Sequence, residues 1–330
     1  MLRTTWRSHA ASLNQRLLAM EPQYRERVWG GQRLHPANPP IGEAWVAYGP
    51  SRVAAGPERG RTLDELVKRA GQDLLGTAVA GRFGSRFPIL VKLLDCADWL
   101  SVQVHPNDAQ ARTMVGPSEF GKTEAWYFLE TSPDARILAG VKPLVGGDEL
   151  AAAIREGRIL DVAAEVPVQA GQAMLIPAGT IHALGPGLLL YEIQQSSDTT
   201  YRAYDWGRPQ SDGRKLHIEE SVAVALPVGP EVLTRPELGM ATGVEPAIAS
   251  PYFDVELARA SATDPLACDT RGLTFHILTA IDGAAEVTCG GETARLARFD
   301  TCVVAAAAGQ YQIRATGEPV TLLRASVPGR

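Results

Sequence analysis

The sequence predicts a mostly β protein built from two small barrels of the jelly-roll type, with short helical insertions. Short apolar runs alternate with turn residues along the chain, and the 330 residues include 32 glycines and 23 prolines. Two stretches have the apolar spacing of a helix instead. A similar order of glycine turn and strand occurs in both halves, which favours one barrel design used twice.

Five runs in the first two thirds of the chain have the length and composition of strands. They are rich in β-branched, leucine and aromatic residues and are bounded by turn residues. The runs are FPILVKLLDC (87–96), WLSVQVH (99–105), EAWYFLE (124–130), AMLIPAG (173–179) and GLLLYEIQQ (187–195).

From Leu100 to His105, the run 99–105 alternates apolar and polar residues. Ser101, Gln103 and His105 therefore share one face, because successive side chains of a strand point to opposite sides. Leu100, Val102 and Val104 then face the other way, toward a core. Pro106 then ends the strand, since proline has no N–H group to donate to the ladder.

Two insertions are predicted to be helical. Residues 62–76 have leucines at helical spacing and open with Thr62 and Glu65 in the pattern of a capping box. Residues 147–165 also have a helical pattern, interrupted at Gly157.

Prolines and glycines cluster at 226–240, which predicts a boundary between two units. We expect a catalytic unit over 21–230 and a second, metal-free unit over 231–330. Residues 1–20 contain arginines and serines and no acidic residue, a composition that resembles a transit peptide. A loosely docked N-terminal tail is the favoured interpretation.

The two units can be aligned by their glycine turns. Setting PAGTIHAL (177–184) beside AAGQYQIR (307–314) places His182 on Gln312. A weaker alignment places Glu124 on Phe275. The first copy has polar residues where the second has inert ones, so chemistry is expected in the first unit.

Charge and composition exclude several classes of partner. The net charge is −5 without long runs of one sign, which argues against nucleic acid or an anionic membrane surface. No apolar run reaches the roughly 20 residues that a membrane-spanning helix needs. The four cysteines form no CxxC pair and are predicted to be reduced thiols of a cytoplasmic protein. The expected partner is a small molecule, and no oligomeric state is indicated.

Polar residues of the first unit suggest a metal site. Two imidazoles, a carboxylate and an amide oxygen are ligands that zinc accepts, with one position left for water or substrate. The residues are Gln103, His105, Glu124 and His182. Oxygen ligands also suit manganese or iron. A lone strand histidine is more often a hydrogen-bonded structural residue, so spacing alone leaves both interpretations open.

Four motifs in order raise the specificity of this pattern: LSVQVHPND, GKTEAWYFLE, IPAGTIHALGPG and EIQQSSDTTYRAYDWGR. Together they resemble the type I phosphomannose isomerases in their short bacterial form. The segments WGGQRL (29–34) and IGEAWVAYGPS (41–51) are similar to that family's N-terminal signature. Members are zinc-dependent enzymes of the cupin fold that interconvert mannose 6-phosphate and fructose 6-phosphate.

The resemblance implies two cupin-like barrels and one zinc ion per chain. Its implied zinc ligands are the four residues named above, Gln103, His105, Glu124 and His182. It assigns Arg202 as the active-site arginine and Glu192 as a proton-transfer group.

Residues that hold the sugar or its phosphate are implied in the same way. Lys122 and Ser101 match residues near the substrate, and Lys122 shares a strand face with Glu124. Arg202 and Arg208 are further candidates for the phosphate, although longer members of the family carry a lysine beyond the arginine. Tyr48 stands where the family more often has serine.

The implied reaction moves a proton between C1 and C2 of an open-chain sugar through a cis-enediol. Glu192 is the candidate base, and a structural hydrogen-bond acceptor is an equally open interpretation of it. Two other functions stay open at this point. The first alternative is an isomerase of another sugar or sugar phosphate. The second is a non-catalytic, sugar-binding regulatory protein.

Overall fold

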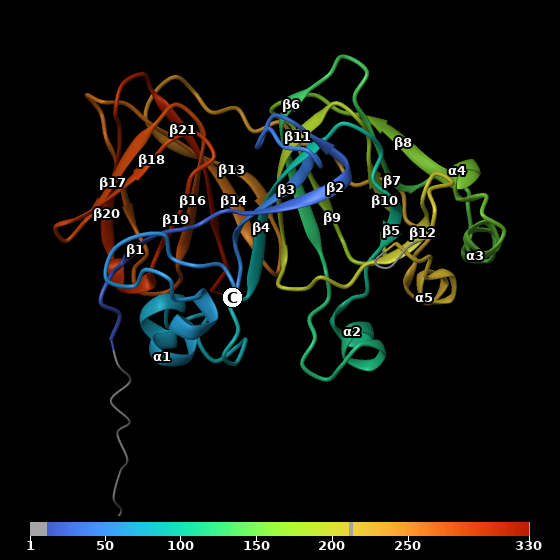
Figure 1. The fold of residues 1–330 in the computed structure, drawn as a ribbon, viewed down its shortest axis with the longest axis horizontal. Helices are drawn as coiled ribbons and strands as arrows, with labels where there is room; N and C mark the ends of the chain where they lie inside the picture. Colours follow the sequence, from blue (N-terminus) through green and yellow to red (C-terminus); the bar gives the residue numbers. More distant parts are fainter. Residues whose placement is uncertain (1–11, 211–213, 330) are drawn as a thin grey trace, which may run out of the picture.

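Four β-sheets make up the computed structural model, which describes residues 12–210 and 214–329 and arranges them as two barrels side by side (Figure 1). In the first barrel, one sheet has the order β12 (Tyr201–Tyr204), β5 (Val102–Val104), β10 (His182–Leu184), β7 (Arg136–Val141) and β8 (Ala163–Pro167). The sheet facing it has the order β2 (Gln23–Gly31), β3 (Ile41–Ala47), β4 (Ile89–Cys96), β11 (Leu188–Gln195), β6 (Glu124–Thr131) and β9 (Ala173–Ile176).

The second barrel is built in the same way. Its larger sheet has the order β1 (Leu17–Ala19), β19 (Thr301–Val304), β16 (His276–Asp282), β21 (Val320–Ser326), β14 (Asp254–Ala260) and β13 (Gly243–Ala249). Its smaller sheet has the order β15 (Leu266–Asp269), β20 (Gln310–Ala315), β17 (Ala285–Cys289) and β18 (Glu292–Leu296).

Strand order repeats between the barrels. The series β3-β4-β11-β6-β9 corresponds to β13-β14-β21-β16-β19, and β5-β10-β7-β8 corresponds to β15-β20-β17-β18. Each strand of these two series thus has its counterpart ten numbers further along the chain. The prediction of a mostly β chain with two cupin-like jelly-roll barrels is confirmed.

The predicted alignment of the two copies is displaced by one residue at its most important position. His182 is buried and pairs with Gln103, whereas on the equivalent strand Tyr311 is the buried residue and pairs with buried Cys268. Gln312 pairs with exposed Ala267 instead. Because a shift of one residue moves a side chain to the other face, Tyr311 takes the inward position.

Apolar clusters fill the spaces between the sheets and explain the strand sequences. Leu188 and Leu190 of β11 belong to the interior of the first barrel, while Tyr191 and Ile193 belong to the cluster between the two large sheets. Both faces of β11 are therefore buried, which is why it is a nearly continuous apolar run rather than an alternating one.

Helices cover the outer face of the small sheet in the first barrel (Figure 1). These helices are α3 (Gly147–Arg155), α4 (Ile159–Val162) and α5 (Ile218–Val224). Val102 and Val104 pack in the same cluster as Leu150 and Ile154 of α3. The predicted alternation is confirmed for 101–105, since the valines face the helices and the polar residues face the barrel interior. The prediction is wrong for Leu100, which lies before β5, packs in the interior cluster and lines the cavity with Ser101.

The predicted helix at 62–76 is α1 (Leu63–Leu75), with Thr62 and Glu65 forming the capping box. Residues 147–165 are only partly helical: α3 and α4 are separated by Gly157 at φ 69°, and β8 starts at Ala163. The prediction of helix over 163–165 is wrong because these residues pair with β7. Helix α2 (Asp108–Met114) and the short 3-10 helix η1 (Ala306–Ala308) were not predicted.

The N-terminal segment departs from the expectation of a loose tail. Leu17, Leu18 and Ala19 form β1, which pairs antiparallel with β19 at the edge of the second barrel. Leu17 and Leu18 are buried, so this part of the predicted tail completes a sheet. Residues 1–11 of that segment lie outside the described residues.

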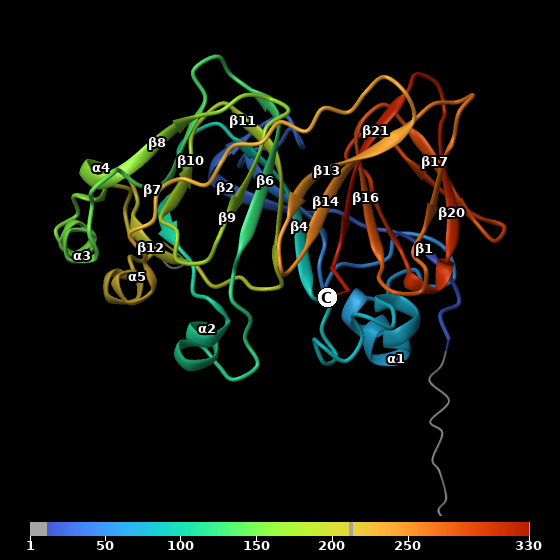
Figure 2. The ribbon, with the colours of Figure 1, turned by 180° about the vertical axis from the view of Figure 1, so that it is seen from behind.

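The chain passes from one barrel to the other after α5. The connecting segment runs across the first barrel before it enters β13, as seen from behind in Figure 2. Thr234 in this segment exchanges backbone hydrogen bonds with Ala173 of β9. We propose a boundary between the two units near residue 230. Strand β1 is the exception, because it precedes this boundary in sequence and belongs to the second barrel.

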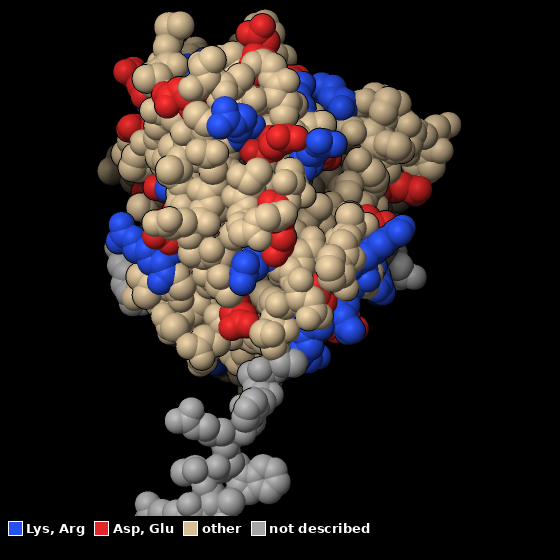
Figure 3. Space-filling view, turned by 90° about the vertical axis from the view of Figure 1, so that its left-hand side faces the viewer, with Lys and Arg blue, Asp and Glu red and all other residues tan. Residues whose placement is uncertain are grey.

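The side of the second barrel turned to the viewer in Figure 3 carries basic and acidic side chains interspersed on a mostly uncharged surface. No helix in the described part of the chain is long and apolar enough to cross a membrane. The cysteines at positions 96, 268, 289 and 302 are all buried and free, as expected for reduced thiols.

A buried histidine in the second barrel predicts a pH-dependent stability. Burial, and next the charge of Arg324, lowers the pKa of His276 to about 3, and its Nδ1 lies 2.7 Å from the Tyr311 hydroxyl. The unfolded chain takes up this proton below about pH 6.5 and the folded chain does not. The stability that neutral His276 contributes is therefore complete above about pH 6.5 and is lost progressively as the pH falls toward 3.

We expect His276→Gln to flatten this dependence. Between about pH 7 and pH 5.5, the wild type should lose roughly 1 kcal/mol more unfolding free energy than the variant. Urea titrations of both proteins at each pH measure the difference, and parallel pH profiles would show that His276 does not contribute it.

Candidate active site

Two rows of side chains face each other inside the first barrel. On the small sheet, Arg202 of β12 pairs with Gln103 of β5, which pairs with His182 of β10. Directly paired residues of antiparallel strands point to the same face of a sheet. Arg202, Gln103 and His182 therefore line one wall in that order, one strand apart.

The opposite wall carries a second row. Lys92 of β4 pairs with Glu192 of β11, which pairs with Trp126 of β6. The Lys92 Nζ atom lies 3.0 Å from Glu192 Oε1, and Trp126 Nε1 donates to Glu192 Oε2 at 3.0 Å. The rings of Trp126 and His182 lie 5.5 Å apart, which brings the two walls into contact.

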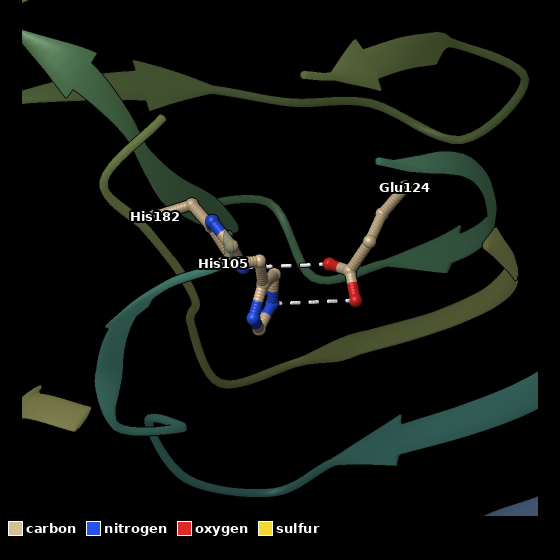
Figure 4. A group of neighbouring side chains, drawn as sticks. All are labelled: His105, Glu124 and His182. Atoms are coloured by element: carbon tan, nitrogen blue, oxygen red, sulfur yellow. Dashed lines mark ion pairs between the residues drawn. The ribbon is translucent and has the colours of Figure 1, made fainter. Parts of the chain in front are cut away.

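His105, Glu124 and His182 form a compact cluster where the walls meet (Figure 4). His105 Nε2 lies 3.4 Å from Glu124 Oε1, and His182 Nε2 lies 3.4 Å from Glu124 Oε2. All three side chains are buried, with about 1% of each exposed. Gln103 adjoins them through its Nε2, which lies 3.2 Å from His182 Nε2.

Backbone carbonyls orient both histidine rings. His105 Nδ1 donates to the Thr199 carbonyl at 3.0 Å, and His182 Nδ1 donates to the Thr180 carbonyl at 2.9 Å. Each ring therefore carries a proton on Nδ1 and turns its Nε2 atom toward Glu124. This is the arrangement in which protein histidines bind metal ions.

The protonation states also suit a cation. Burial, and next the charge of Lys122, lowers the pKa of His105 to about 3, so its ring is neutral. Burial alone would raise the pKa of Glu124, but Lys122 and His105 lower it well below its usual value. The site thus presents the Glu124 carboxylate and the neutral imidazole of His105 beside the Nε2 atom of His182.

Two buried atoms of the cluster, His105 Nε2 and Glu124 Oε2, have no hydrogen-bond partner among the described residues, whereas Glu124 Oε1 pairs with the Lys122 ammonium group at 3.0 Å. Such atoms cost free energy when they stay unpaired in the interior. Their convergence on one point indicates that the cluster holds a ligand, and the donor set fits a divalent metal ion.

A cavity of about 490 Å³ opens beside the cluster. Of the residues predicted from the sequence, it is lined by Ser101, Gln103, Lys122, Glu124, Glu192 and Arg202. Lys122 is buried, and its Nζ lies 3.0 Å from Glu124 Oε1 and 3.3 Å from Thr200 Oγ1.

Arg208 occupies a different position from the other predicted residues. Its guanidinium pairs with Asp98 at 2.6 Å and with Asp205 at 3.2 Å. Its side chain is not among those that line the cavity.

Several lining residues were not singled out by sequence reasoning. They are Glu26, Arg27, Glu43, Arg214 and His217. Arg27 and Glu43 form an ion pair at 2.9 Å, and Trp45 Nε1 donates to Glu43 Oε2 at 2.5 Å. The alternation of β3 places Glu43 and Trp45 on one face, and this is the only sequence signal that could have indicated the contact between them.

Fold and site together define a double-barrel protein with a polar cavity in the first barrel and a donor set for a divalent metal ion. Residues 17–125 match the family model described as the catalytic domain of phosphomannose isomerase type I. The mannose-6-phosphate isomerase of Streptococcus mutans is 34% identical over 301 residues, which are 87% of this chain and 92% of that protein. The chain therefore belongs to the type I phosphomannose isomerase family.

Solved structures agree with this assignment. The mannose 6-phosphate isomerase of Bacillus subtilis superposes with a TM-score of 0.82 at 29% identity, covering 94% of this chain and 99% of that one. A mannose 6-phosphate isomerase described as holo and zinc bound has a TM-score of 0.75 at 18% identity over 95% of this chain and 100% of that one, which shows a shared fold. The prediction of an enzyme of this family is confirmed.

Proposed function

We propose that the chain interconverts mannose 6-phosphate and fructose 6-phosphate with a zinc ion held by His105, Glu124, His182 and Gln103. The observation that carries this proposal is the cluster of two histidine Nε2 atoms and one carboxylate, buried beside a cavity lined by cationic and acidic residues. The activity of the curated relative supports the choice of substrate.

Zinc is the metal we propose because the donors are two imidazole nitrogens and a carboxylate oxygen. Turning the Gln103 amide about its Cγ–Cδ bond exchanges donor for acceptor, so that this side chain can present Oε1 to the ion. The zinc-bound neighbour with the same fold also supports zinc. When bound, the ion supplies Lewis-acid stabilisation of the negative charge that develops on the sugar oxygens.

Glu192 is the base in this proposal. Burial, and next the charge of Glu124, raises its pKa above the usual value for glutamate, which makes its carboxylate a better proton acceptor. Lys92 and Trp126 each hold one of its oxygens and fix the direction of the group. In a cis-enediol mechanism, one such carboxylate takes the proton from C2 and returns it to C1 on the same face.

Three further residues bind the substrate in this proposal. Lys122 and Ser101 line the cavity next to the metal ligands, where they can donate to hydroxyl groups of the open-chain sugar. Arg202 lies one strand from Gln103 and offers planar donors for anionic oxygens. The sequence prediction also places Arg208 at the phosphate, and its ion pairs with Asp98 and Asp205 make that role the weakest of the set.

Metal removal tests the function directly. The purified chain is assayed for conversion of mannose 6-phosphate to fructose 6-phosphate as prepared, after chelation, and after zinc is added back. We expect activity to disappear with chelation and to return with zinc. A zinc-loaded protein that is folded but does not turn over this substrate would contradict the proposal, and activity that survives complete chelation would contradict the role of the metal.

A further inference from the structure

The cavity is electrically divided between its two ends. Burial would lower the pKa of Lys92, but the charges of Glu192, Glu43 and Glu124 raise it. These three carboxylates line the metal end of the cavity. At the other end, the charges that act on Arg202 are those of Arg214 and Asp205. The carboxylates Glu192 and Glu124 are matched at the metal end by Lys92 and Lys122. At the second end Arg202 and Arg214 lie beside the single carboxylate of Asp205, which leaves cationic charge for an anionic part of a substrate.

At this second end, the guanidinium group of Arg202 is held in place and, among the residues described, has a free donor. Its Nη1 donates to the Lys215 carbonyl at 3.0 Å, which fixes the plane of the guanidinium. Its Nε is buried and has no hydrogen-bond partner within the described part of the chain. A buried, fixed donor without an acceptor is costly unless a ligand supplies one.

Arg214 lines the same end and is held in a defined orientation. Its Nε and Nη2 atoms pair with the two carboxylate oxygens of Asp205 at 2.9 and 2.5 Å. This two-pronged pair leaves Nη1 out of the contact with Asp205. Arg208 shares the same carboxylate and also reaches Asp98, outside the cavity.

His217 supplies a neutral donor beside the two arginines. Its Nδ1 accepts a hydrogen bond from the Arg202 backbone N–H at 3.3 Å, so the ring proton sits on Nε2. His217 also lines the cavity. Two guanidinium groups and an N–H donor at one end of a cavity suit the oxygens of a phosphate dianion.

We propose that Arg214, together with Arg202, binds the 6-phosphate group of the substrate, and that Asp205 positions Arg214 for this contact. Arg202 lies two strands from His182, a separation of about 10 Å at the usual strand spacing, which is comparable with the length of an open-chain hexose phosphate. The carbonyl end of the sugar then lies at the metal cluster. This inference rests on the proposed function and replaces Arg208 by Arg214 at the phosphate.

The test compares Arg214→Gln with Arg208→Gln and a surface control. Arg155→Gln is the control because Arg155 pairs with exposed Glu219 on the outer helices. Each zinc-loaded protein is assayed for kcat and KM with mannose 6-phosphate. Binding of glucitol 6-phosphate, an open-chain analogue without a reactive carbonyl, is measured by calorimetry at fixed ionic strength, with glucitol as the uncharged reference.

We expect Arg214→Gln to raise KM and the Kd of glucitol 6-phosphate about 10- to 100-fold, with kcat changed only a few-fold. Arg208→Gln should have a smaller effect than Arg214→Gln, and Arg155→Gln should have none. Equal binding by wild type and Arg214→Gln, or a larger effect of Arg208→Gln, would overturn the assignment.

Failure of this inference can be told apart from failure of the proposed function. A wild-type protein without isomerase activity contradicts the function, whereas an active wild type with an unaffected Arg214→Gln contradicts only the phosphate site. Zinc content and circular dichroism check that the variant is folded. If Arg214→Gln does not fold, Arg214→Lys keeps the charge and loses the planar donors, and an unchanged KM in that variant overturns the proposal.

Discussion

Replacing His182 with alanine is expected to remove the metal ion and nearly all activity while both barrels stay folded. The variant loses one of the two imidazole ligands, and the remaining donors are too few to hold a zinc ion tightly. We expect zinc content to fall close to zero, and kcat to fall on the order of 10³-fold or more because metal stabilisation is worth several kcal/mol. Elemental analysis and the coupled assay measure both.

His35→Ala is the matched control for this experiment. His35 is exposed, stacks on Tyr24 with ring centroids 4.6 Å apart, and is not among the residues that line the cavity. It should keep its zinc and its activity. A His182→Ala protein that retains both would show that the three-residue cluster is a structural hydrogen-bonding site.

The second large effect is expected from the pair formed by Lys92 and Glu192. Glu192→Gln keeps the shape of the side chain and removes the base, so kcat should fall about 10²- to 10⁴-fold with little change in KM. Lys92→Met leaves the Glu192 carboxylate buried without its cation, which should lower the free energy of unfolding by about 3 kcal/mol. Steady-state kinetics and urea unfolding measure the two effects separately.

The double variant separates catalysis from structure. Combining Lys92→Met with Glu192→Gln removes both charges, and we expect it to regain much of the stability lost in Lys92→Met while remaining inactive. If Glu192→Gln instead loses stability and keeps its kcat, Glu192 is a structural partner of Lys92 and Trp126, and another group is the base.

Much of the structure of the first 230 residues could be predicted because its signals are local. The alternation of Ser101, Gln103 and His105 with apolar residues depends only on the period of a strand. The capping box of Thr62 and Glu65 depends on three residues of spacing. The order of the four motifs likewise needs no knowledge of which strands pair, and it led to the correct family.

Other predictions failed where long-range pairing competes with local preference. Residues 163–165 continue a helical pattern, yet they form a strand because β7 offers them a partner. Leu17–Ala19 lie before the first barrel in sequence and complete the second barrel in space, since β19 has a free edge there. The offset between Gln312 and Tyr311 has the same origin, because pairing between strands decides which residue faces inward.

By itself, the sequence of this protein determined the kind of fold, the motifs and the residue types available for a metal and a sugar phosphate. Only the tertiary structure decided which of these residues meet. Arg202, Arg208 and Arg214 lie within 13 positions of one another, but Asp98 and Asp205 hold Arg208 outside the cavity while Arg214 lines it. The physical reason is that an arginine's role depends on the carboxylates and cavity walls around it, and strands distant in sequence supply both.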